Sequence, residues 1–172
     1  EGCMHRPPIS VRVNTLKISV NELFERFEKQ GIKVEKSPLC EDVLLLEKAG
    51  DISSLKEFSD GLFHIEDAAC ALCCEALSPK EGDRILDACA APGGKSFTLA
   101  ELTRDKAEII SADIYEHKTK LIKDGAKRLQ IGSIKTVLNN AEVYNESLGV
   151  FDKILCDVPC SGLGIIRKKP EI

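Results

Sequence analysis

The chain has 172 residues, enough for one medium-sized domain or two small ones. Its net charge of −4 and its pI of about 5.5 exclude a generally basic nucleic-acid-binding protein, so any RNA contact must use local patches. No apolar run approaches the roughly 18 residues that cross a membrane, so we expect no membrane partner. Eight cysteines, several inside apolar helix or strand patterns, favour a cytoplasmic protein with free thiols over a secreted disulfide scaffold.

The N-terminal part, residues 1–65, is predicted to form a small α+β module. Alternating apolar and polar residues predict a first strand, with Val11 and Val13 inward and Arg12 and Asn14 outward. A capping box then begins a helix, and further strands follow, so that the expected elements cover 9–16, 19–31, 32–34, 43–46 and 58–65. RNA recognition and simple packing against the rest of the chain are equally compatible with such a module.

A helix is expected over 66–77, before a turn at Pro79 and Gly82. Its predicted buried side consists of Ala68, Ala69, Leu72, Cys73 and Ala76. Three of its cysteines have helical spacing and resemble part of a zinc site: Cys70, Cys73 and Cys74. No second Cys/His pair at the spacing of a zinc finger accompanies them. We therefore expect packing and no metal.

The segment from Arg84 to Ser96 organises the chain, because it reads as a buried strand, a tight turn and the start of a helix. A phosphate-binding P-loop is excluded, since Cys89 stands where that motif needs glycine. The dinucleotide-binding pattern G-x-G-x-x-G is also absent, because Gly93 and Gly94 are adjacent and no third glycine follows. A loop for S-adenosylmethionine fits better, because that cofactor needs close backbone approach without a phosphate cradle; an ordinary β–α turn is the alternative. The expected cofactor loop is Cys89, Ala90, Ala91, Pro92, Gly93, Gly94 and Lys95.

From residue 84 onward, strand and helix patterns alternate, which predicts a parallel, doubly wound α/β sheet with ligands at the carboxyl ends of its strands. The first strand should be covered on both faces. The later elements are expected at 95–103, 108–112, 115–130, 134–138 and 151–156. The helix over 115–130 should bury Leu121, Ile122, Gly125 and Leu129, and its lysine-rich remainder is read as a solvated surface.

Polar residues follow each of the four strands. Asp87 ends the first, and Asp113 ends the second, where a carboxylate suits the hydroxyls of a ribose. NAD-binding proteins also place an acid at this position, so Asp113 alone does not identify the cofactor. Asn139 and Asn140 follow the third strand and suit an adenine edge, and Asp157 follows the fourth. Each residue alone could serve as a turn or cap, but four strand ends that meet at one edge favour a binding site.

Several segments together resemble the Sun (Nol/Nop) family of RNA 5-methylcytosine methyltransferases, most closely its bacterial ribosomal RNA enzymes. They are 87–95 (DACAAPGGK), 112–114 (ADI), 157–161 (DVPCS), 7–17 (PPISVRVNTLK) and 164–170 (GIIRKKP). The resemblance implies S-adenosylmethionine as methyl donor and a cytosine in RNA as acceptor. It also implies a Rossmann-like methyltransferase sheet over 66–172, incomplete with its first four strands, behind an RNA-binding module. RNA contacts are then expected at Arg12 and at the basic cluster of Arg167, Lys168 and Lys169, although an ordinary solvated loop explains that cluster equally well.

The chemistry of this family explains the Pro-Cys pair. A thiolate that adds to carbon 6 of cytosine makes carbon 5 nucleophilic, and an acid near ring nitrogen 3 assists the addition. Cys160 and Asp157 are the expected catalytic residues, and Asp157 could instead hold the cofactor. Cys160 resembles the cysteine that helps release the product, although in DNA enzymes the Pro-Cys thiol itself attacks. The target base must be unpaired or flipped out.

Two departures from the family pattern stand out. The chain ends at Ile172 without the Thr-Cys motif that carries the attacking thiol, and Asn140 replaces a usual acid. A complete sheet of this class needs about seven strands, so we expect further residues beyond 172 and an inactive isolated chain. A non-catalytic RNA- or cofactor-binding module is the alternative, and an NAD-type oxidoreductase is disfavoured by the missing glycine. Nothing in the pattern indicates an oligomeric state.

Overall fold

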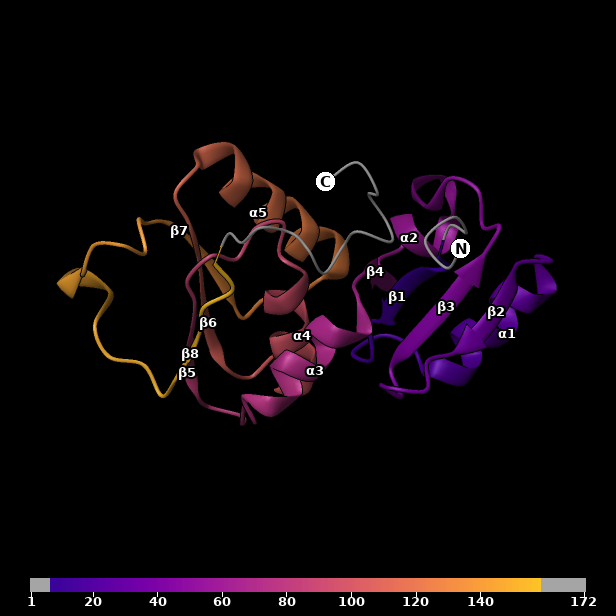
Figure 1. Cartoon of the computed structure of the whole chain (residues 1–172), viewed down its shortest axis with the longest axis horizontal. Coiled ribbons are helices and arrows are strands. Elements are labelled where there is room, and N and C mark those ends of the chain that lie inside the picture. Colours follow the sequence, from indigo (N-terminus) through magenta and orange to yellow (C-terminus); the bar gives the residue numbers. More distant parts are fainter. Residues whose placement is uncertain (1–6, 159–172) are drawn as a thin grey trace, which may run out of the picture.

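The computed structural model describes residues 7–158, which form two packed modules (Figure 1). The first contains a four-stranded antiparallel sheet in the order β2-β3-β1-β4, with α1 against one face. Its elements are β1 (Ile9–Val13), α1 (Val20–Lys29), β2 (Lys33–Lys36), β3 (Val43–Glu47), a 3-10 turn (Ile52–Ser54), α2 (Lys56–Ser59) and β4 (Phe63–Ile65). The expected strand, helix and strand order of the N-terminal part is therefore confirmed.

The start of α1 shows why the local sequence folds as it does. The Ser19 hydroxyl accepts a hydrogen bond from the backbone N–H of Glu22 at 3.3 Å, and the Glu22 carboxylate accepts one from the backbone N–H of Ser19 at 3.2 Å. This capping box satisfies two amides that a helix start would leave without partners. Leu23 and Phe27 then lie fully buried against the sheet, beside Val11 and Val13.

The second module is an α/β unit whose four parallel strands lie in the order β7-β6-β5-β8. In Figure 1 its helices lie between this sheet and the first module. The elements are α3 (Ala68–Ala76), β5 (Arg84–Asp87), α4 (Gly94–Leu102), β6 (Glu108–Asp113), α5 (Glu116–Leu129), β7 (Ile134–Leu138), a 3-10 turn (Glu146–Leu148) and β8 (Lys153–Leu155). The parallel sheet and its four strands agree with the sequence-based expectation. No helix within 7–158 is long and apolar enough to cross a membrane.

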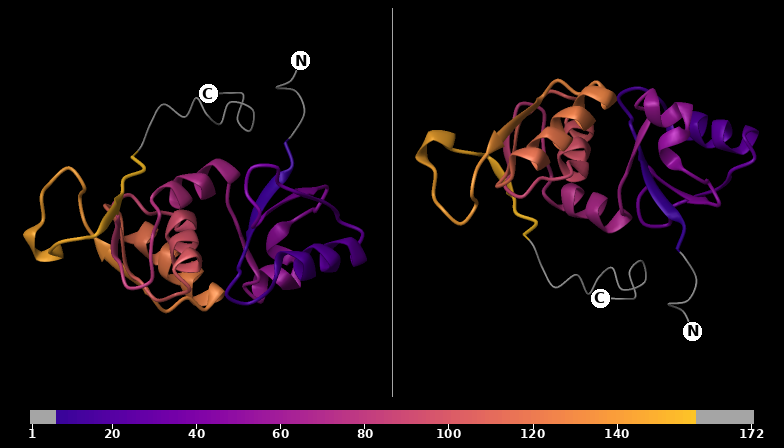
Figure 2. Two further views of the ribbon diagram at one scale, coloured as in Figure 1. Left: turned by 90° about the horizontal axis from the view of Figure 1, so that it is seen from below. Right: turned by 90° about the horizontal axis from the view of Figure 1, so that it is seen from above.

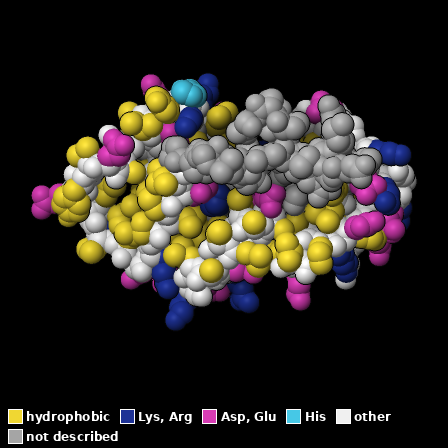
Figure 3. Space-filling view, in the orientation of Figure 1, with side chains coloured by type: hydrophobic (Ala, Val, Ile, Leu, Met, Phe, Trp, Pro, Cys, Tyr) yellow, Lys and Arg dark blue, Asp and Glu magenta, His cyan; other side chains and the backbone are white. Residues whose placement is uncertain are grey.

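Only one face of the parallel sheet is covered by helices within residues 7–158 (Figure 2). Ile85 points to the helices and is fully buried, whereas Leu86, on the other face, is only partly buried. Leu138 and Ile154 are more than half exposed, and Figure 3 shows hydrophobic side chains gathered at the end of the molecule that carries this sheet. The expectation that β5 is covered on both faces is therefore wrong for the described residues, because the connections β5–β6 and β6–β7 both place their helices on the same side.

Two predicted helix faces are correct only in part, with Ala68, Ile122 and Leu129 buried as expected. In α3 the buried side chains are Ala68, Ala71 and Cys74, while Leu72 and Cys73 are exposed. In α5 the buried residues are Ile122, Ala126 and Leu129, while Leu121 is half exposed. One residue turns a helix by 100°, so the neighbour of a buried residue, such as Leu121 beside Ile122, can point away from the core.

The outward face of β1 is not a solvent face, because the second module covers it. Arg12 is fully buried: its Nε donates to Glu101 Oε2 at 2.7 Å, and its Nη2 lies 3.1 Å from Asp42 Oδ2. Asn14, also fully buried, donates from Nδ2 to the carbonyl oxygens of Gly61 and Leu129, each at 2.9 Å. Arg12 and Asn14 thus lie on the outward face of β1, opposite Val11 and Val13, but this face is buried. We withdraw Arg12 as an RNA contact, because its guanidinium already binds the other module.

Candidate functional site

The loop after β5 makes a sharp turn that requires glycine at position 93. This residue has φ +115°, and a Cβ placed on it would lie 2.4 Å from Cζ of Phe97. Only glycine tolerates both the backbone angle and the contact. The turn is closed by a hydrogen bond of 2.8 Å from the Gly93 amide to the Ala90 carbonyl, and the Ala90 amide donates to the Ala112 carbonyl on β6 at 2.8 Å. The loop is thus fixed against the neighbouring strand, with bare backbone beside Gly94 at the start of α4.

Asp87, at the end of β5, is buried beneath this loop with 1% exposure. Its Oδ2 accepts a hydrogen bond of 2.7 Å from the Ser96 hydroxyl, and Ser96 Oγ accepts one of 2.7 Å from the hydroxyl of Ser111. Its Oδ1 has no hydrogen-bond partner within the described chain. Burial raises the pKa of Asp87 to about 6, because water no longer solvates the carboxylate. Such a carboxyl can accept a cationic or donor group from a ligand.

A pocket of about 690 Å³ opens at the carboxyl ends of β5, β6, β7 and β8. This volume is in the usual range for small-molecule sites. Among its lining residues are the predicted Cys89, Ala91, Asp113, Asn139, Asn140 and Asp157. The structure therefore brings together residues from all four strand ends, as expected for a doubly wound sheet.

Two of these strand-end residues also have structural roles. Asp113 is 5% exposed, accepts a hydrogen bond from the Tyr115 amide at 3.2 Å, and lies 3.7 Å from the ammonium nitrogen of Lys118. Asn140 accepts a hydrogen bond of 3.0 Å from the Glu142 amide, which is turn chemistry. Since both residues also line the pocket, their turn contacts fix them in place at its wall.

Lys95 and Asp157 form an ion pair of 2.6 Å between the start of α4 and the end of β8. Burial opposes the charge of Lys95, but the hydrogen bond and charge of Asp157, together with the nearby Cys70, raise the pKa of Lys95. The lysine therefore stays protonated. It holds the Asp157 carboxylate, which is itself more than half exposed, at the mouth of the site.

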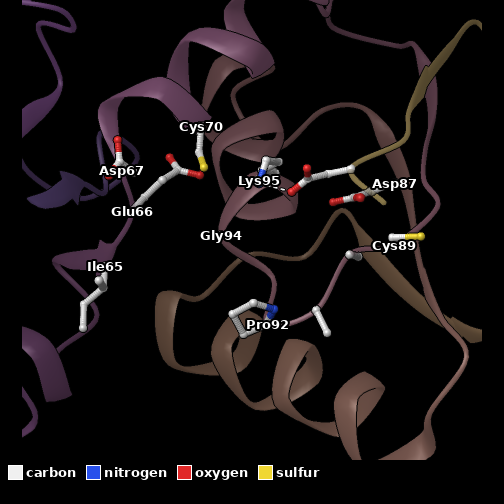
Figure 4. Close-up of a pocket in the computed structure, with 12 residues that line it drawn as sticks. Ile65, Glu66, Asp67, Cys70, Asp87, Cys89, Pro92, Gly94 and Lys95 are labelled. Carbon is white, nitrogen blue, oxygen red and sulfur yellow. Dashed lines mark hydrogen bonds and ion pairs between the residues drawn. The ribbon is translucent and has the colours of Figure 1, made fainter. Parts of the chain in front are cut away.

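A smaller pocket of about 190 Å³ adjoins the first on the side of α3 (Figure 4). It shares Cys89, Ala91 and Asp157 with the larger pocket, so the two lie next to each other. Gly94 and Lys95 border it from α4, and Glu66 borders it from the β4–α3 connection. Sequence reasoning missed Glu66: an acid just before a helix reads as a cap, and the neighbouring Asp67 does perform that role, accepting from the Ala69 amide.

The remaining expectations fall into three groups. All seven predicted loop residues are placed at or beside the two pockets, with Gly93 buried behind the loop against Phe97. Cys160, Arg167, Lys168 and Lys169 lie outside the described residues. Within 7–158, no three His, Cys, Asp or Glu side chains come together as a metal site requires, and the six cysteines of that range carry free thiols.

Comparison with known proteins gives two family matches. Residues 74–172 match the 16S rRNA methyltransferase RsmB/F family, and residues 2–53 match the ferredoxin-like domain of RsmF/B-like methyltransferases. The probable ribosomal RNA small subunit methyltransferase B of Bacillus subtilis is 42% identical over 168 residues, which are 96% of this chain and 37% of the relative. The chain thus spans little more than a third of the length of that curated relative.

Solved structures resemble both modules at once. A methyltransferase homolog protein from Pyrococcus horikoshii is 34% identical with a TM-score of 0.86, over 96% of this chain and 54% of that one. NSun6 from Pyrococcus horikoshii, solved with SFG, is 25% identical with a TM-score of 0.84, over 95% of this chain and 66% of that one. The arrangement of the two modules is therefore shared with experimentally determined structures.

Proposed function

The chain belongs to the family of 16S rRNA methyltransferases RsmB/F, and on that premise we propose that its whole protein methylates carbon 5 of a cytosine in ribosomal RNA. The family match confirms the resemblance noted in the sequence and the methyltransferase fold. The observation that carries the proposal is the convergence of the glycine loop, Asp113, Asn140 and Asp157 on one pocket at the strand ends.

S-adenosylmethionine is the methyl donor of this family, and the residues of the larger pocket fit it. Asp113 would accept hydrogen bonds from the two ribose hydroxyls, and the Asn140 side chain would contact the adenine edge. The backbone of 89–94 would lie against the rest of the cofactor, and Gly93 permits the turn of this loop because a Cβ there would clash with Phe97. The cofactor supplies an electrophilic methyl group, and the chain's own residues bind and orient it.

The cytosine would enter beside Asp157, where the lysine-held carboxylate can interact with ring nitrogen 3. A cysteine thiolate that adds to carbon 6 makes carbon 5 able to attack the methyl group; loss of the carbon 5 proton then expels the thiol. Cys160 follows Asp157 by three residues and is proposed either to attack or to assist product release. If Cys160 instead assists product release, the attacking thiol would come from a Thr-Cys motif that these 172 residues do not contain, and we expect them to transfer no methyl group by themselves.

RNA is the proposed macromolecular partner. The basic residues Arg167, Lys168 and Lys169 would contact backbone phosphate near the target base, and the ferredoxin-like module would bind RNA further away. The free thiols fit a reducing compartment, in keeping with a cytoplasmic protein.

Tritium release tests the position of methylation. Ribosomal RNA labelled with tritium at carbon 5 of cytosine is incubated with the whole protein and S-adenosylmethionine. Methylation of carbon 5 must release that tritium to water, whereas methylation of N4 or of a ribose hydroxyl leaves it in place. Asp157→Asn and Cys160→Ser should abolish release, and Cys73→Ser, on the exposed side of α3, should not. Cofactor binding without any methyl transfer by the whole protein would instead support the non-catalytic binding module.

A further inference from the structure

Two buried carboxyl oxygens without partners face the smaller pocket. Glu66 is 5% exposed; its Oε2 accepts a hydrogen bond from the Thr98 hydroxyl, and its Oε1 has no partner within the described chain. Asp87, 1% exposed, likewise leaves Oδ1 without one. Both side chains line the same 190 Å³ pocket, on either side of the start of α4 (Figure 4).

Such oxygens need a donor, because a buried acceptor without a hydrogen bond is costly and rare in folded proteins. Burial raises the pKa of both carboxyls, because little water remains to solvate the charged form. The cation in this pocket, Lys95, is already held 2.6 Å from Asp157. A ligand group that fits here is therefore small, positively charged and rich in hydrogen-bond donors.

The position of the smaller pocket beside the larger one indicates which part of a bound ligand would reach it. It adjoins the larger pocket through Cys89, Ala91 and Asp157, so a molecule in the larger pocket can extend past the glycine loop into the smaller one. An adenosine held by Asp113 and Asn140 would direct its 5′ substituent that way. In S-adenosylmethionine that substituent is an amino acid, whose α-ammonium group has three donors and a positive charge.

We propose that Glu66, from the junction of the two modules, accepts a hydrogen bond from the α-ammonium group of S-adenosylmethionine. The proposal rests on the proposed function, because it requires the adenosine part in the larger pocket. Glu66 Oε1 supplies the acceptor and Thr98 fixes the other carboxyl oxygen. Gly94 lies beside it: a Cβ at this position would be 3.4 Å from Glu66 Oε1, so the glycine leaves more room in front of this oxygen.

The test compares adenosine ligands with and without the ammonium group, measured by calorimetry on the whole protein. S-adenosylhomocysteine and decarboxylated S-adenosylmethionine carry the ammonium; 5′-methylthioadenosine carries neither ammonium nor carboxylate. Glu66→Gln keeps the size but removes the charge. It should weaken the first two ligands by about 10-fold or more, as expected for loss of a charge-assisted hydrogen bond. Binding of 5′-methylthioadenosine should remain within about twofold.

The matched control is Glu57→Gln, because Glu57 is also a buried glutamate but accepts from Gln30 at 2.6 Å within the first module, away from the pocket. It should leave all three affinities unchanged. Should Glu66→Gln not fold, Glu66→Asp keeps the charge and withdraws it by one methylene. That variant should also weaken the ammonium-bearing ligands selectively.

Three outcomes overturn the inference. One is an unchanged affinity for S-adenosylhomocysteine in the variant, and another is an equal loss for 5′-methylthioadenosine. The third is an effect on the KM for RNA alone, which would assign Glu66 to the target base. The proposed function fails separately, if the wild-type protein binds none of the adenosine ligands or releases no tritium from labelled RNA.

Discussion

The buried ion pair between Arg12 and Glu101 allows a prediction that distinguishes a structural role of Arg12 from a role in RNA binding. Arg12→Met keeps the length of the side chain and removes the charge. Both partners of the 2.7 Å contact are fully buried, so the variant leaves Glu101 without its cation. His64 Nε2 lies 3.3 Å from the other carboxyl oxygen of Glu101, but that oxygen makes no well-aligned hydrogen bond. Breaking a buried ion pair from one side costs about 3–5 kcal/mol.

Urea denaturation of Arg12→Met and wild type measures this loss of unfolding free energy. Asp42 is one-third exposed, so its contact with Arg12 adds little to the total. Lys33→Met is the control, because its 2.8 Å pair with Glu47 is exposed to water and its loss should change the unfolding free energy little. Arg12→Met combined with Glu101→Leu should recover most of the loss, since the buried carboxylate that had lost its cation is then removed as well. A loss below about 1 kcal/mol for Arg12→Met, with weakened RNA binding, would refute the structural role.

Two further predictions concern the loop. Asp87 has a pKa of about 6 in the folded protein against 3.8 as its ordinary value, so the folded state holds the proton more tightly. Its contribution to the unfolding free energy should fall by roughly 2 kcal/mol as the pH rises from 4 to 6, and Asp87→Asn should remove this part of the slope in urea melts at successive pH values. An unchanged slope would contradict this. Gly93→Ala should destabilise the protein more than Gly31→Ala, which has φ +75° but open space and should cost about 1 kcal/mol, because Gly93 adds a clash with Phe97. An equal decrease in melting temperature for the two variants would contradict this, because it would mean that the Phe97 ring moves away from the added methyl group at no cost.

Local chemistry made part of this molecule predictable. The capping box of α1, the glycine turn after β5 and the polar residues at the strand ends each depend on a few neighbouring residues, and each was found where it was expected. The partners of Arg12 and Asn14 were not predictable in this way. Glu101 and Leu129 lie 89 and 115 residues away, and alternation along β1 shows only that one face differs from the other. Whether water or a second module covers that face depends on packing between modules.

Glu66 escaped prediction for the same reason, and its surroundings show what the first module contributes to the site. Thr98 and Glu101 are three residues apart and therefore share one face of α4. Thr98 holds Glu66, and Glu101 binds Arg12 of β1. Arg128 of α5 adds hydrogen bonds of 2.6 and 3.0 Å to the carbonyl oxygens of Phe58 and Phe63.

Helix α4, which follows the glycine loop, is thus fixed to the ferredoxin-like module on the face that carries Glu101. The position of β4 relative to α4 decides where the Glu66 carboxylate points, because Glu66 directly follows β4 and its contact with Thr98 crosses the junction. A ligand that needs Glu66 therefore binds to a site that neither module forms alone.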